Sequence, residues 1–309
     1  MDQAKRFHFY TRVDLVGNMN FIGSRKIFYG ISGTMLAFSV VSFFIFGLSL
    51  GADFTGDAIL IGTFKDRDVS SDEVRAAFEK EGIGVDSLDI RDGRNLYLRA
   101  RFLSEESHQH LLRILGTFDG FDEQSFVSRG PTIGMQLRRN ALTAILVALA
   151  AIILYIAWAF RHVSRPVSSW IYGLVAITAL IHDITIPTGL FSFLRIEIDT
   201  LFVSALLTIL GFSVHDTIVV FDRVRENLKK AEGTKKFADI VEASVRETFT
   251  RSVNTSLTTI LALVAIYFFG GASTHNLALA LIVGILVGTY SSIFIASPLL
   301  VTIEQWKRK

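Results

Sequence analysis

Long apolar stretches alternate along this chain with short charged ones. Six of the apolar stretches are near or above the length of about 20 residues that a helix needs to cross a bilayer. We place the membrane spans at residues 27–50, 138–160, 168–191, 201–221, 252–269 and 277–303. The pattern therefore predicts a polytopic α-helical membrane protein.

The segment between the first two spans, residues 51–137, has the pattern of a water-soluble domain with its linkers. A capping box from Ser70 to Glu73 opens one helix, and Asp92-Gly93 between alternating residues indicates a type I′ hairpin. The expected elements in chain order are strand 58–64, helix 70–83, hairpin 87–102, helix 104–118 and strand 121–129. This βαββαβ order predicts a small ferredoxin-like α/β sandwich outside the membrane.

The distribution of Lys and Arg predicts how the spans are oriented. The net charge is only +2, but basic residues cluster, whereas the loops 192–200 and 270–276 are poor in them. The basic segments are 1–26, 161–167, 222–251 and 304–309. The positive-inside rule places all of these in the cytoplasm, with both termini. The charge thus reports topology and gives no indication of nucleic-acid binding.

Three further features refine this topology. The first span could be a cleaved signal peptide, but it is longer than a signal core and no small-residue cleavage site follows, so we expect a retained helix. The chain has no cysteine, so the outer domain must fold without disulfides. Phe237, Val241 and Val245 recur every four residues in the 222–251 loop, which predicts an amphipathic helix that lies on the membrane or on a partner.

Ionisable residues inside the spans are the candidate functional residues, because each costs about 2.5–3.5 kcal/mol at a span centre. They are His182-Asp183 in the third span, His215-Asp216 in the fourth and Arg251 at the start of the fifth. Asp216 and Arg251 have similar expected depths and could form an ion pair. Such a pair could simply hold the bundle together, but two His-Asp pairs at different depths favour ion transport, because both residue types can titrate there.

Small and polar residues extend these positions into stripes at helical spacing. The fourth-span stripe is Ser204, Thr208, Gly211 and His215, and the fifth-span stripe is Arg251, Asn254, Thr255 and Thr258. Stripes of this kind join helices by hydrogen bonds or line a wetted path. Gly284 and Gly288 in the sixth span have the spacing of a packing motif.

The sequence contains no sign of catalytic or cofactor chemistry. It has no phosphate-binding loop, no serine nucleophile motif and no cluster of metal ligands. His108 and His110 lie two apart on a helix, so we expect them to face solvent and not a metal. We therefore expect a protein that is not an enzyme, carries no cofactor and draws its energy from an ion gradient.

The stretch GFSVHDTIVVFDRVREN, residues 211–227, strongly resembles the fourth-span signature of the SecF family of protein-export membrane proteins. The signature residues are Gly211, Asp216, Asp222, Arg223, Arg225, Glu226 and Asn227. Further agreements are Asp53, Phe54 and Gly56, Gly130, Pro131 and Gly134, ALIHD, and RSVNTSLTTILAL. The chain departs from the family at His215, where Asn is usual, and at Asp57, where a second Gly is usual.

The resemblance implies a fold similar to half of a resistance-nodulation-division transporter. It also implies an accessory subunit of the bacterial Sec translocase in the inner membrane, driven by protons or sodium ions. The implied partners are SecD, the SecYEG channel, YajC, translocating preproteins and membrane lipids. The family's proton-linked residues map onto Asp216, Arg251, His182 and Asp183, with His215 beside them. An ion-coupled small-molecule exporter and a scaffold without ion coupling stay as alternatives; one domain of about 75 residues leaves an exporter little room for a substrate pocket.

Overall fold

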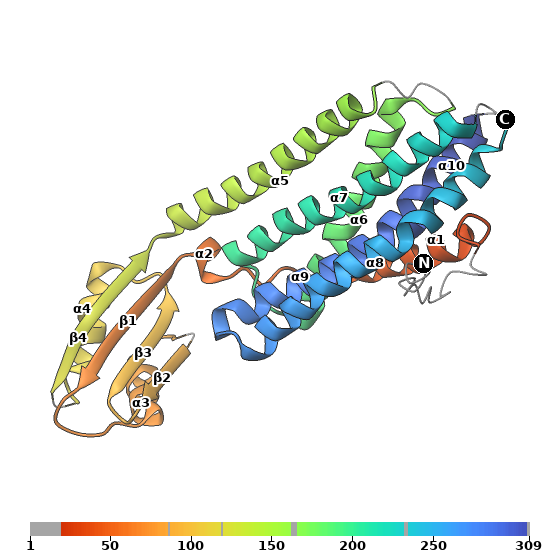
Figure 1. Ribbon diagram of the computed structural model, residues 1–309. Helices are drawn as coiled ribbons and strands as arrows, with labels where there is room; N and C mark the ends of the chain where they lie inside the picture. The colour runs from red at the N-terminus through yellow and green to blue at the C-terminus, as the bar shows by residue number, and fades with distance from the viewer. Residues whose placement is uncertain (1–19, 86, 119, 162–165, 232–233, 308–309) are drawn as a thin grey trace, which may run out of the picture.

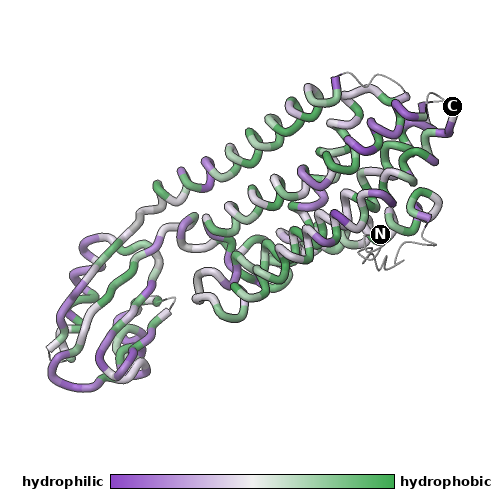
Figure 2. Tube along the Cα trace, viewed as in Figure 1, coloured by the Kyte–Doolittle hydropathy of each residue, from purple (hydrophilic) through white to green (hydrophobic). Residues whose placement is uncertain are grey.

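The computed structural model describes residues 20–85, 87–118, 120–161, 166–231 and 234–307. Within these residues, long helices form a bundle, and a small α/β domain lies at one end of it (Figure 1). Six helices in this described part are long and apolar enough to cross a membrane, which confirms the expected fold class. Hydrophilic residues gather in the α/β domain and at the opposite end of the bundle, with hydrophobic residues between them (Figure 2).

The bundle is organised around α6 (Ser169–Leu194). Its residues Tyr172, Val175 and Ala179 are fully buried, whereas α5 (Pro131–Ala159) stands to one side and exposes most of its length. α6 is mostly apolar, and the other helices cover more than half of it, but Leu174 and Ile181 stay exposed. The long helices are α1 (Arg25–Phe46), α5 (Pro131–Ala159), α6 (Ser169–Leu194), α7 (Thr200–Ala231), α8 (Phe237–Phe269) and α9 (Ala272–Ser291).

The sixth span is interrupted by one widened turn. The π-helical segment η1 (Ser292–Ala296) follows α9 directly, and α10 (Ser297–Lys307) follows η1. Pro298 has no N–H to donate to the preceding turn, so the α-helical hydrogen-bond pattern cannot continue through this point. Ser297 Oγ instead donates to the carbonyl of Ser292 at 2.9 Å.

The segment 222–251, expected to be a cytoplasmic loop with an amphipathic helix, is mostly helical. The fourth-span helix continues to Ala231, and α8 already begins at Phe237. Phe237, Val241 and Val245 are buried in the chain's own hydrophobic core. The amphipathic face was identified correctly, and it packs on the chain's own bundle, where a contact with the membrane or with a partner was expected.

The outer domain has the expected βαββαβ order. Its elements are β1 (Asp57–Phe64), α3 (Ser71–Lys80), β2 (Ser87–Arg91), β3 (Asn95–Arg101), α4 (Glu105–Leu115) and β4 (Phe121–Arg129). The four strands are antiparallel in the order β2-β3-β1-β4, which is the ferredoxin-like arrangement. Val74 and Phe78 of α3 and Leu111 and Leu115 of α4 join the core that covers one face of the sheet.

The local signals of this domain are confirmed, with one exception. Ser70 Oγ accepts the N–H of Glu73 at 3.3 Å, as a helix cap. Asp92 and Gly93 both have positive φ, 55° and 69°, as a type I′ turn requires. The prediction for His108 was wrong: its ring is buried and stacks on Phe126 of β4 at 3.6 Å between centroids.

Candidate functional site

Asp183 on α6 is completely buried and joins three helices. Its Oδ2 accepts hydrogen bonds from Ser213 Oγ of α7 at 2.5 Å and Ser291 Oγ of α9 at 2.7 Å. Its Oδ1 lies 2.9 Å from His182 Nδ1, and His182 Nε2 lies 3.1 Å from Ser32 Oγ of α1. Both oxygens of this carboxylate are therefore satisfied within the chain.

Asp216 on α7 occupies a similar but sparser site. Its Oδ1 accepts a hydrogen bond from Ser252 Oγ of α8 at 2.5 Å, and its Oδ2 accepts one from Ser292 Oγ of η1 at 2.8 Å. The side chain is buried, with 6% of the residue exposed. The carboxylate thus ties α7 to both α8 and the sixth span.

Helix geometry explains how two carboxylates share these helices. Ser213 and Asp216 are three residues apart, so they lie on one face of α7. Ser291 and Ser292 are adjacent, and a helix turns by about 100° per residue, so one faces α6 and the other faces α7.

Close packing brings the helices together here, since a Cβ on Gly288 would lie 3.1 Å from Ser213 Cβ. A Cβ on Gly284 would lie 2.1 Å from Ile209 Cδ1, so the packing role expected of these two glycines is confirmed.

The sequence reasoning identified both carboxylates and His182 but none of the serines that bind them. A carboxyl group in an apolar run is conspicuous because it is costly there. A serine is not, because its hydroxyl can bond back to its own helix. The sequence offered one signal, which is the position of the serines relative to the charged residues. Ser213 lies one helical turn before Asp216, and Ser252 is the residue after Arg251.

The ion pair expected between Asp216 and Arg251 is not formed. Arg251 is exposed on α8, and within the described residues no carboxylate lies within 4.0 Å of its guanidinium. Arg251 and His215 are both exposed, and neither of them supplies a hydrogen bond to the Asp216 carboxylate. The physical reason is direction: the Asp216 side chain faces the bundle interior, whereas the side chains of His215 and Arg251 face outward.

The predicted polar stripes lie on the outer surface of the bundle. Ser204, Thr208, Asn254, Thr255 and Thr258 are all exposed, as is Gly211. The serine and threonine hydroxyls donate to carbonyls of their own helices. His215, Arg251 and Asn254 have no side-chain hydrogen-bond partner in the described part of the chain.

The charged residues 222–227 at the end of the signature connect α7 to α8 at a distance from the two carboxylates. Arg225 pairs with Asp222, and Arg223 pairs with Glu226 at 2.6 Å and also with Glu247 of α8. Asn227 Nδ2 donates to Ser244 Oγ of α8 at 3.0 Å. These contacts hold the ends of α7 and α8 side by side.

Two other motifs meet where the outer domain joins the bundle. Asp53, in the short helix α2 (Ala52–Thr55), accepts hydrogen bonds from Thr200 Oγ1 at 2.5 Å and Thr200 N at 3.2 Å, at the start of α7. A Cβ on Gly134 would lie 2.7 Å from Phe54 O, so α2 packs directly on the backbone of α5. Gly130 caps α5, with Pro131 as its first residue.

The same junction shows how the chain tolerates its departure from the family at Asp57. Gly56 has φ of +88°, a conformation that favours glycine. Asp57 instead begins strand β1 and pairs in register with Arg101 and Arg129. The tight backbone position is therefore retained by the single glycine.

The fold and site define a polytopic membrane protein with two hydrogen-bonded carboxylates buried in its bundle. The family described as protein export membrane protein SecD/SecF, C-terminal, matches residues 114–306. Protein translocase subunit SecF of Thermobaculum terrenum is 41% identical over 92% of this chain and 93% of its own length. The corresponding subunit of Sebaldella termitidis is 37% identical over 94% of each chain. The chain belongs to the SecF family of protein-export membrane proteins.

Longer relatives contain the same unit. Protein translocase subunit SecDF of Bacillus subtilis is 35% identical over 90% of this chain, which covers 37% of that protein. The crystal structure of SecDF from Thermus thermophilus, described as a translocon-associated membrane protein, is 34% identical and has a TM-score of 0.74. It covers 94% of this chain, and this chain covers 39% of it.

Proposed function

We propose that this subunit of the Sec translocase works with SecD to couple a proton gradient to protein export across the bacterial inner membrane. Family membership supports the translocase role, and relatives that carry the SecDF name support association with SecD. The proton coupling rests on the environment of Asp216. The SecYEG channel, YajC and the translocating preprotein are further proposed partners.

The observation that carries the proposal is that neutral hydroxyls, and not a cation, hold Asp216. When the carboxylate is charged, Ser252 and Ser292 donate to it. When it is protonated, its O–H can donate to one of these hydroxyls, because serine also accepts hydrogen bonds. The site is thus satisfied in both charge states, as a group that binds and releases a proton requires. A contact ion pair with Arg251 would have favoured the charged state alone, so the alternative of a purely structural ion pair loses its support.

Asp183 and His182 form the neighbouring part of this path. The adjacent residues Ser291 and Ser292 bind one carboxylate each, so movement of the sixth span alters both sites together. Ser32, His182 and Asp183 extend the polar line to α1. We propose that a proton that enters beside His182 and Asp183 reaches Asp216 when the π-helical turn η1 rearranges.

The exposed stripes of α7 and α8 are the proposed contact for SecD. His215, Arg251 and Asn254 are polar groups on membrane helices, and leaving them against lipid is costly. A second bundle that covers this face would remove the cost and place its own groups beside Asp216. The partner could then sense the charge of Asp216 through Arg251.

Asp53 provides a route from the bundle to the outer domain. It binds the first residue of α7, the helix that also carries Asp216. The adjoining chain forms a further bridge, because Gly51 N donates to Ile198 O at 2.8 Å. Tilting of α7 would therefore pull on the linker that leads into β1. The uncovered face of the sheet exposes Ile59, Tyr97 and Val127, which could contact a translocating chain or a partner domain.

Both termini are proposed to lie in the cytoplasm. Residues 1–19, 162–165 and 308–309 of the basic segments lie outside the described residues, so this proposal rests on the sequence. Cysteines introduced at Ser107 in α4 and at Lys235, both exposed, should react with a membrane-impermeant reagent from opposite sides. Reaction of both from one side would overturn the proposed topology.

The decisive test is Asp216→Asn, which keeps the shape but cannot ionise. In vesicles that contain the SecYEG channel and SecD, it should abolish the part of export that depends on the proton gradient. Membrane insertion and co-purification with SecD should stay intact. Asp222→Asn is the matched control, because Asp222 is exposed and its ion pair with Arg225 lies outside the site.

Other outcomes separate the remaining functions. Normal export by Asp216→Asn would leave Asp216 structural and favour a scaffold without ion coupling. Export that follows a sodium gradient when the proton gradient is collapsed would replace the proton by sodium. Gradient-driven efflux of small molecules by the chain without SecD would favour the exporter alternative.

A further inference from the structure

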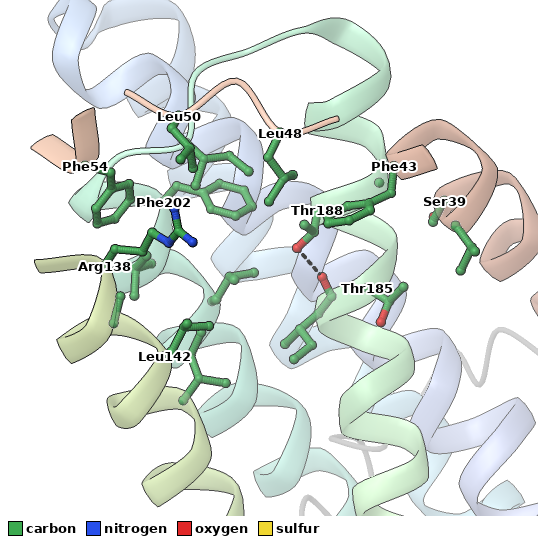
Figure 3. A pocket seen from close by; sticks show the side chains of 18 of the residues that line it. Ser39, Phe43, Leu48, Leu50, Phe54, Arg138, Leu142, Thr185, Thr188 and Phe202 are labelled. Carbon is green, nitrogen blue, oxygen red and sulfur yellow. Dashed lines mark hydrogen bonds between the residues drawn. The ribbon is translucent and has the colours of Figure 1, made fainter. Parts of the chain in front are cut away.

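A cavity of about 730 Å³ lies in the bundle on a different side from the two carboxylates. It is lined by Val40 and Phe44 of α1, Leu142 of α5, Ile184 of α6 and Phe202 of α7. Figure 3 shows Leu142 and Phe202 among the lining side chains. Its volume is in the range of about 300–1,000 Å³ typical of pockets that hold small ligands. Val40, Phe44 and Leu142 are exposed, so the cavity opens to the outside of the bundle, where the bilayer lies.

The side chains that line the cavity suit an apolar occupant. Its three hydroxyls, those of Ser39, Thr185 and Thr188, donate to carbonyls of their own helices at 2.6–2.9 Å. None of them therefore has a hydrogen left to donate to a polar ligand. A hydrocarbon chain from the surrounding membrane can therefore fill the cavity without leaving a lining side chain unsatisfied.

One cation stands at the cavity. Arg138 is exposed on α5 and extends among the lining residues toward Phe202 (Figure 3). It lies two turns after Pro131, at the end of the bundle that joins the α/β domain, where lipid headgroups are expected. Within the described residues it forms no ion pair, so its charge is available to an anion.

We propose that this cavity binds an anionic phospholipid. An acyl chain lies between α1 and α5. The phosphate pairs with Arg138, because a phosphate matches the guanidinium in charge and geometry. Leu50 and Phe54 also line this cavity, and Phe54 directly follows Asp53 in the sequence. A bound lipid would therefore pack against the linker to the outer domain. The proposal does not depend on which ion drives export.

Native mass spectrometry of the purified full-length chain tests this, with phosphatidylglycerol and phosphatidylcholine as the added probes. The wild-type chain should retain phosphatidylglycerol roughly fivefold better, the factor expected from about 1 kcal/mol for one basic residue near a lipid surface. Arg138→Gln should abolish this preference. Arg139→Gln is the matched control, because Arg139 is exposed on the same helix but does not line the cavity.

Ala141→Phe tests the location of the acyl chain, because Ala141 lines the cavity and a larger side chain would fill it. It should reduce retention of both lipids, with helical content and monodispersity unchanged. Equal losses in Arg138→Gln and Arg139→Gln would mean binding to the general surface and would overturn the proposal. If the chain that is purified together with SecD no longer retains phosphatidylglycerol, the cavity would be assigned to a protein partner instead.

Discussion

Asp183 and Asp216 are the same residue type in the same bundle, but their surroundings differ. Asp183 has a ring nitrogen at one oxygen and two hydroxyls at the other, and it is completely buried. Asp216 has one hydroxyl at each oxygen, and the side chains of His215 and Arg251 are on the exposed face. Both carboxylates are satisfied within the chain, but Asp216 has fewer partners and is followed on the outer face of the bundle by the exposed stripes of α7 and α8.

This difference assigns different roles to the two carboxylates. A buried group with several partners resists change, because each lost hydrogen bond leaves an unsatisfied polar atom. Asp216 has one partner at each oxygen and adjoins the face that we propose SecD covers. We therefore propose that, of the two carboxylates, Asp216 is the one where binding of a proton and contact with SecD are most directly linked.

The largest contrast in export rate is expected between alanine variants of two adjacent serines, Ser291 and Ser292. Ser292→Ala leaves Oδ2 of Asp216 without a partner, whereas Ser291→Ala leaves both oxygens of Asp183 bonded, through Ser213 and His182. An unsatisfied buried acceptor costs about 1–3 kcal/mol, so Ser292→Ala should slow gradient-dependent export by about tenfold or more. Ser291→Ala should slow it less than about fivefold. Equal export rates of the two variants in vesicles would erase the distinction between the sites.

Arg251→Gln should have an intermediate effect. Its guanidinium makes no contact ion pair with any residue that the structure describes, so the free energy of unfolding should change by less than about 0.5 kcal/mol. Export should nevertheless fall about fivefold, the equivalent of about 1 kcal/mol of lost attraction to Asp216. Arg251→Lys keeps the charge and should restore most of the rate. A failure of Lys to rescue would point to the guanidinium's hydrogen bonds with SecD instead of its charge.

The smallest effect is expected for His215→Asn, which introduces the family's usual residue. Neither hydrogen bond of Asp216 involves the imidazole, so export near neutral pH should change by less than about twofold. The pH profile of gradient-dependent export is the sensitive measurement. A large loss of rate would make His215 a member of the proton path and not a neighbour of it.

Local signals determined much of the architecture. The capping box at Ser70 and the Asp92-Gly93 turn act over a few residues, so the βαββαβ order could be predicted from the sequence. The spans follow from hydrophobicity alone, since a bilayer requires long apolar helices. The carboxylates were recognisable for the same reason, because a charge is conspicuous in an apolar run.

Tertiary packing decided the rest. Serine is cheap in a membrane helix, so only the approach of α7, α8 and the sixth span showed which serines hold Asp183 and Asp216. His108 is buried because Phe126, on a strand that follows its helix, stacks on its ring. The amphipathic helix expected within 222–251 is part of the long helix α8, because its apolar face packs on the same core as α7. In each case the deciding contact joins residues far apart in the sequence, and hydrophobic periodicity and local capping carry no information about such contacts.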